Sequence, residues 1–281
     1  MVKTLAFRVD STQPNVSLTP NAPLEPETET PRPSASLSPA ENPPWGIPAV
    51  LLIFVFNFLA FNVIAAAVFV ALHALSRYRD LSLNSFTQSP LALIPQALSY
   101  LFTFFLMVLI VQKGTYDDFW SVLKWRWPHR IVSLLLVGIA MLGFAQLCSL
   151  FLPIPKSLPI DRFFRSTHAA WVLAIFGILV APLYEELVFR GFLYPALRRF
   201  LPLTASVLVD GVLFAGIHGP QLGWAWAPLL MLLIVGCVLT VVRWKTGSLA
   251  AAFLVHSAYN ACDFALIFIA TGGFRHLERL S

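Results

Sequence analysis

Ionisable and polar side chains interrupt three otherwise apolar stretches of the chain, and their types could support chemistry. In chain order these residues are Glu185, Glu186, Arg190, Asp210, His218, His256, Asn260 and Asp263. A carboxylate can take a proton from water, and a histidine can orient that water or donate a proton to a leaving amine. Neutral histidine and asparagine donors can stabilise a developing oxyanion. These residue types together predict hydrolytic chemistry.

The same set contains two histidines and one carboxylate, which is a common pattern of catalytic zinc sites. If a metal takes part, the predicted ligands are Glu185, His218 and His256. The residues suit a metal-free, glutamate-dependent hydrolysis equally well. The residue types thus leave the use of a metal open, and zinc is the candidate cofactor.

Helical spacing separates the two neighbouring glutamates. Residues four apart share a helix face, while neighbours point about 100° apart. Glu186 and Arg190 are therefore predicted to form an ion pair, in the favourable Glu-before-Arg order. Glu185 points elsewhere and lacks that partner. Pro182 removes a backbone N–H and should kink this helix, which would free carbonyls beside the glutamates.

The other two stretches also place their polar residues on single helix faces. The two faces consist of Asp210, Phe214 and His218, and of His256, Asn260 and Asp263. A straight helix that starts after Pro202 would put His218 about 24 Å along its axis. That depth exceeds the depth expected for His256, so tilt, a later helix start or a broken helix must bring the two histidines level.

Each of these features has an ordinary structural alternative. A Glu–Arg pair can be a buried clasp between helices. A histidine before Gly-Pro can lie at an interface, and a His–Asn pair can hydrogen-bond to another helix. Asp210 and Asp263 are expected to be supporting partners rather than catalysts. The occurrence of all these groups on three successive polar-bearing helices favours a catalytic interpretation.

Composition indicates the elements that must position these residues. The 281 residues are 58% hydrophobic and 12% charged, with a mean hydropathy of +0.75. Soluble domains carry about 25% charged residues, so most of this chain is expected to face lipid. The net charge of +5 fits basic residues that flank membrane spans. No basic stripe suggests a nucleic-acid partner.

Seven apolar segments predict an all-α, polytopic bundle of about seven transmembrane helices. A helix needs about 20 apolar residues to cross a bilayer. The segments lie within Trp45–Ser76, from Pro90 to Lys113, within Arg130–Lys156, from near His168 past Glu185, on either side of Gly219-Pro220 within Leu201–Val242, and from near Ser248 to before Gly272.

The domain organisation follows from these segments. Residues 1–44 are rich in proline, serine and threonine and are predicted to be a disordered tail. Residues 45–165 are predicted to carry three spans, 166–275 four spans with the site, and 276–281 a C-terminal tail. We expect a multi-pass protein of a bacterial-type plasma membrane, and loop charges slightly favour a cytoplasmic N-terminus.

Three motifs in this order resemble the CAAX prenyl protease and bacteriocin-processing family of intramembrane proteases, also called the Abi family. The matching residues are Glu185-Glu186-x-x-x-Arg190, Phe214-x-x-x-His218 and His256-x-x-x-Asn260. The stretch Lys245–Leu249 also looks similar to the family. The resemblance covers roughly residues 168–271.

The resemblance implies proteolysis within the membrane, by a mechanism that is often labelled metalloprotease but can also be glutamate-dependent. Carried over to this chain, Glu185 and His218 would activate water, while His256 and Asn260 would stabilise the oxyanion. Glu186 and Arg190 would shape the site. Bacterial members are also linked to bacteriocin processing and self-immunity.

Two other functions stay open at this stage. One is a non-enzymatic membrane scaffold or self-immunity protein that keeps the fold, although a scaffold needs neither both glutamates nor both histidines. The other is a proton-coupled transporter, which predicts inverted repeats in both halves; here the polar groups lie only in the C-terminal half. The predicted partners of the enzyme are a membrane protein or peptide substrate and the lipid bilayer, and the sequence does not identify that substrate.

Overall fold

The computed structural model describes residues 42–164 and 166–280, and within these residues the chain is helical, without β-strands. The tail was predicted over residues 1–44, and its residues 1–41 lie outside the described residues. Residues 42–46 precede the first helix without regular structure, and Pro43 and Trp45 are buried there.

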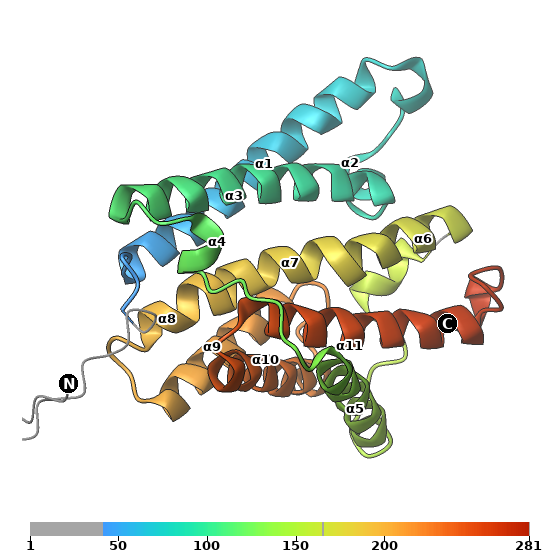
Figure 1. Cartoon of the computed structure of the whole chain (residues 1–281). Helices are drawn as coiled ribbons and strands as arrows, with labels where there is room; N and C mark the ends of the chain where they lie inside the picture. Colours follow the sequence, from blue (N-terminus) through green and yellow to red (C-terminus); the bar gives the residue numbers. More distant parts are fainter. Residues whose placement is uncertain (1–41, 165, 281) are drawn as a thin grey trace, which may run out of the picture. The chain divides into compact units, whose positions relative to one another are not determined.

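Six helices are long and apolar enough to cross a membrane (Figure 1). They are α1 (Ile47–His73), the segment Pro90–Gly114 that contains α3 (Leu93–Gly114), α5 (Ile131–Ser149), a composite helix over Thr167–Leu197, α10 (Trp226–Thr246) and α11 (Leu249–Ala270). A seventh apolar helix, α9 (Leu203–Ile217), is shorter. The prediction of a polytopic bundle of about seven helices is therefore confirmed.

The composite helix is irregular at the position that Pro182 predicted. It comprises α6 (Thr167–Ile175), a π-helical turn over Phe176–Val180, α7 (Ala181–Glu186), a second π-helical turn over Leu187–Leu193, and α8 (Tyr194–Leu197). In the first π turn, the Ala181 N–H donates to Phe176 O. The next carbonyl in this register, Gly177 O, would face residue 182, and proline has no N–H to offer it.

Residues at the helix ends explain where α10 and α11 stop and start. α10 ends at Gly247, whose φ of 61° lies in the left-handed region that glycine adopts without strain. Ser248 then caps α11 by accepting the Ala251 N–H on its hydroxyl. The same hydroxyl donates to the carbonyl of Arg126, which anchors the start of α11 to the loop after the short helix α4 (Phe119–Val122).

Helices pack in three main pairs, α1 with α3, α5 with α11, and α9 with α10. Small residues permit two of these contacts. A Cβ on Gly138 of α5 would lie 2.7 Å from the Val255 carbonyl of α11, and one on Gly236 of α10 would lie 2.9 Å from the Cα of Gly211. Backbones therefore meet directly at these points.

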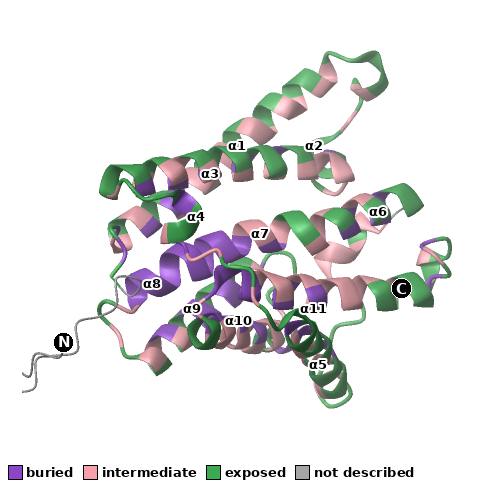
Figure 2. Cartoon of the chain, viewed as in Figure 1, coloured by how far each residue is buried: buried purple, intermediate pink, exposed green. Residues whose placement is uncertain are grey.

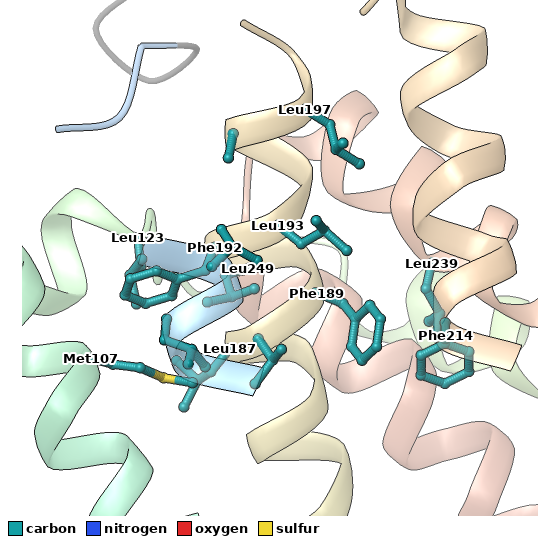
Figure 3. Packing of buried hydrophobic residues seen from close by; sticks show 14 of the residues in the cluster. Met107, Leu123, Leu187, Phe189, Phe192, Leu193, Leu197, Phe214, Leu239 and Leu249 are labelled. Atoms are coloured by element: carbon teal, nitrogen blue, oxygen red, sulfur yellow. The ribbon is translucent and has the colours of Figure 1, made fainter. Parts of the chain in front are cut away.

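The composite helix contains the longest buried stretch of the described residues (Figure 2). Every residue from 185 to 197 is buried, and Phe189 packs edge-on against Phe214 of α9, with ring centres 5.3 Å apart (Figure 3). By contrast, α1 exposes large apolar side chains such as Phe58 and Val63. Apolar helices with exposed apolar surfaces are typical of a multi-pass membrane protein.

Candidate active site

Arg190 is the centre of a fully buried ionic cluster. Its Nη1 lies 3.0 Å from Glu186 Oε1, which confirms the predicted i,i+4 ion pair, and its Nε lies 3.3 Å from Asp210 Oδ2. All three side chains have no exposed surface. Asp210 thus supports Arg190 from the neighbouring helix α9.

Two residues of α10 complete the surroundings of this arginine. Arg190 Nη2 donates to the Gly236 carbonyl at 2.7 Å, and its Nε lies 3.3 Å from the Thr240 hydroxyl. Thr240 also donates to Asp210 Oδ2 at 2.5 Å. Neither residue was predicted from the sequence. The sequence feature that could have indicated them is a polar threonine in an apolar run, with a glycine four residues earlier on the same helix face.

Glu185 points away from this cluster and toward two histidines. Its Oε1 lies 3.7 Å from His218 Nε2, and its Oε2 lies 3.7 Å from His256 Nε2. Glu185 is 8% exposed and has no lysine or arginine within ion-pair distance among the described residues. The structure therefore brings together the three residues that the sequence proposed for chemistry.

The depth of Glu185 explains how two histidines at different depths reach it. Measured from the end of the bundle that holds Leu197, Leu203 and Leu249, His256 lies about 10 Å along its helix and His218 about 22 Å. Glu185 lies about 18 Å from the same end, between the two. The carboxylate accordingly meets one imidazole from each side.

Hydrogen bonds fix which nitrogen of each imidazole carries a proton. His218 Nδ1 lies 2.7 Å from the Phe214 carbonyl, and His256 Nδ1 lies 2.9 Å from Glu186 Oε1. Both partners can only accept, so each Nδ1 carries hydrogen. In its neutral form, each imidazole then presents a lone pair on Nε2 toward Glu185.

Asn260 lies one turn beyond His256 and makes a contact that the sequence did not predict. Its side-chain amide nitrogen donates to the Gly177 carbonyl at 2.7 Å. This is the carbonyl that Pro182 leaves without a backbone donor, about two turns before the glutamates rather than beside them. One N–H of the Asn260 amide is used in this bond, and the second is left for another acceptor.

Glu185, His218, His256 and Asn260 all line one cavity of about 1240 Å³. Its walls come mainly from the C-terminal halves of α1, α5 and α9, the N-terminal parts of α3 and α10, residues 173–185 of the composite helix and residues 256–267 of α11. Because successive spans run in opposite directions, these parts lie toward the same membrane face. That face carries the turn between α9 and α10.

The donor atoms of the site are of the types that bind zinc, but their positions do not form a metal site. The two Nε2 lone pairs and the Glu185 carboxylate match the donors of zinc sites. No group of three or more His, Cys, Asp or Glu that could hold a metal ion occurs among residues 42–164 and 166–280, however.

Fold and site together define a multi-pass membrane protein with a buried carboxylate between two histidines. Residues 167–262 match the family model of type II CAAX prenyl endopeptidase Rce1-like proteins. The matched segment contains all three motifs, so the resemblance seen in the sequence is confirmed there. At the level of this family, the match supports an intramembrane protease of the CAAX type.

Two curated relatives come from Lactococcus lactis subsp. lactis (strain IL1403). The UPF0177 protein YbdI is 25% identical over 162 residues, which cover 56% of this chain and 86% of the relative. The UPF0177 protein YxdF is 35% identical over 86 residues, which cover 31% of this chain and 44% of the relative. No solved structure matches the chain.

Proposed function

We propose that this protein is an intramembrane endopeptidase that hydrolyses peptide bonds of membrane-associated proteins or peptides. The observation that carries the proposal is the convergence of Glu185, His218 and His256 on one cavity within the apolar helices. A buried carboxylate between two imidazoles has the groups that amide hydrolysis requires.

The tautomers suggest how water is held. A water molecule that donates one hydrogen to Glu185 Oε1 and the other to His218 Nε2 has both of its hydrogens occupied by acceptors. Its lone pairs then point away from these two groups, toward a substrate carbonyl. Glu185 takes the proton as the oxygen of water attacks the carbonyl carbon.

Charge on the substrate oxygen needs donors on the other side of the site. Asn260 offers its second amide N–H. His256 becomes a donor at Nε2 when it carries a second proton, and the Glu186 carboxylate at its Nδ1 stabilises the positive charge that results. Glu186 and Arg190 therefore shape the site by holding His256 in place.

Collapse of the tetrahedral intermediate completes the reaction. The bond between carbon and nitrogen breaks, and the proton taken up by Glu185 passes to the leaving nitrogen. The products are a carboxylic acid and an amine, and Glu185 returns to its ionised form. Transfer of the acid proton to the amine then gives a carboxylate and an ammonium group. In the metal-dependent alternative, Glu185, His218 and His256 would be the ligands, and zinc would supply Lewis-acid polarisation of the water or the carbonyl.

The test compares N-termini in membranes from cells that express the wild-type protein or the Glu185→Ala variant. We expect a set of N-termini that depends on Glu185 and is also lost in His218→Ala. Asp80→Asn, which removes an exposed carboxylate from a loop, serves as the control and should keep the set. If both active-site variants retain wild-type cleavage and function in cells, the scaffold or self-immunity function replaces the protease.

We further propose a bacterial-type plasma membrane with the N-terminus in the cytoplasm. The support for this orientation is the loop-charge difference, and seven spans then place the C-terminus outside. A phosphatase reporter fused after residue 281 should be active in the periplasm, and one fused after Arg126 should be inactive. The reverse pattern would overturn the orientation.

A further inference from the structure

Asp263 is a charged residue of the cavity that the proposed mechanism does not use. It lines the cavity that contains Glu185, His218 and His256, and it is half-buried on α11. No hydrogen bond or ion pair of its carboxylate is found among the described residues, in contrast to Asp210, which Arg190 and Thr240 hold. The sequence-based expectation that Asp263 supports another side chain therefore has no counterpart here.

Apart from the histidines, the ionisable side chains among the described residues that line the cavity are carboxylates. They include the carboxylates of Glu185, Asp161 and Asp263 and neither lysine nor arginine. Asp161 has a structural task, since its Oδ2 accepts the Leu158 N–H at 2.6 Å. Glu185, which is more than nine-tenths buried and faces the cavity, has no lysine or arginine partner among the described residues. Such a cavity favours a positively charged occupant.

Helical register relates Asp263 to the site of chemistry. His256 and Asp263 are separated by two helical turns and so share a face of α11, with about 10 Å between them along the axis. An extended peptide rises about 3.3 Å per residue. A substrate that runs along α11 would therefore bring the side chain about three residues from the cleaved bond next to Asp263.

From this placement we infer that Asp263 forms a specificity subsite that selects substrates with a lysine or arginine about three residues from the cleaved bond. The inference rests on the proposed protease function and adds the class of substrate. An ammonium or guanidinium group would form a charge-assisted hydrogen bond with Asp263 inside a cavity whose described lining contains no lysine or arginine. Neutral or acidic side chains at this position would leave the carboxylate unpaired.

The experiment uses purified full-length protein in detergent and, as its probe, a solubilised extract of bacterial membrane proteins. New N-termini are identified by mass spectrometry after digestion by the wild-type protein, Glu185→Gln, Asp263→Asn and Asp80→Asn. We expect lysine and arginine to be enriched severalfold about two to four residues from the Glu185-dependent cleavage sites. Asp263→Asn should abolish the enrichment, whereas Asp80→Asn, which removes an exposed carboxylate outside the cavity, should leave it intact.

A second measurement uses a peptide from one of these cleavage sites, with its basic residue present or replaced by glutamine. The wild-type protein should cleave the glutamine peptide about tenfold less efficiently or worse, as expected for the loss of a charged hydrogen bond. Asp263→Asn should cleave both peptides at similar rates, and Asp263→Lys should prefer a glutamate peptide. Melting temperatures in detergent check that each variant is folded.

The two hypotheses fail in different ways. Glu185-dependent cleavage without basic enrichment, or with enrichment that persists in Asp263→Asn, overturns the subsite and leaves the protease standing. The absence of any Glu185-dependent N-terminus overturns the protease and the subsite with it.

Discussion

Replacing Glu186 by glutamine should destabilise the protein as well as inactivate it. Glu186 Oε1 contacts both Arg190 and His256, and neither Glu186 nor Arg190 has exposed surface. Breaking a buried ion pair from one side typically costs about 3–5 kcal/mol. Because Arg190 keeps its contacts with Asp210 and the Gly236 carbonyl, we expect a loss at the lower end, about 3 kcal/mol.

The assay combines thermal unfolding in detergent with cleavage of a substrate identified by N-terminal profiling. Glu185→Gln is the matched control, because it makes the same chemical change one residue away without touching Arg190. It should lose about 10²- to 10⁴-fold in cleavage, as expected for a general base, and keep its melting temperature. Equal melting temperatures for both variants would refute the buried-pair argument, and normal cleavage by Glu185→Gln would refute the choice of base.

Compensating substitutions sharpen this test. The sequence alone suggests that Arg190→Gln should partly rescue Glu186→Gln, since both charges of the pair are then gone. In the structure Arg190 also neutralises Asp210, so the double variant leaves that carboxylate buried without a cation. We expect recovery of stability only when Asp210→Asn is added. Full rescue by the double variant would show that Asp210 does not need Arg190.

Three further outcomes are expected. Gly138→Ala should lose about 1–3 kcal/mol of stability, because the added Cβ would meet α11. Gly143→Ala lies in the same helix with open space at its Cβ, so it should be neutral or slightly stabilising, and melting temperatures compare the two variants. Deleting residues 1–41, which spares the buried Trp45, should leave a membrane-inserted and active protein, as fractionation and cleavage assays would show. Protein treated with chelator and shown to be metal-free should retain activity; activity that requires zinc, with zinc lost in His218→Ala, would instead support the metal-dependent mechanism.

Local spacing predicted the parts of the site that depend on one helix. The i,i+4 rule identified the Glu186–Arg190 pair and left Glu185 free, and both features are present. The irregularity at Pro182 also followed from the missing backbone N–H. These inferences need only the geometry of a helix, which the sequence specifies residue by residue.

Contacts between helices could not be predicted in the same way. Arg190 meets Asp210, Gly236 and Thr240 from two other helices, and which face of α10 turns toward it depends on packing at Gly211 and Gly236. Hydrophobic periodicity gives little guidance here, because lipid-facing and buried side chains are equally apolar. The bond between Asn260 and Gly177 likewise required knowing which turn of the composite helix lies beside α11.

The short helix α9 has a consequence for the release of products. Its 15 residues rise about 22 Å, which is less than the thickness of a hydrocarbon layer of about 30 Å. The turn that follows α9 satisfies its own backbone groups through hydrogen bonds such as Leu222 N–H to His218 O and Trp224 N–H to Gly219 O. Hydrolysis would turn one neutral amide into two charged chain ends, which are costly in hydrocarbon. Gln221, in the turn that follows α9, lines the cavity, so the proposed protease would offer those ends a polar side chain on the side of this turn.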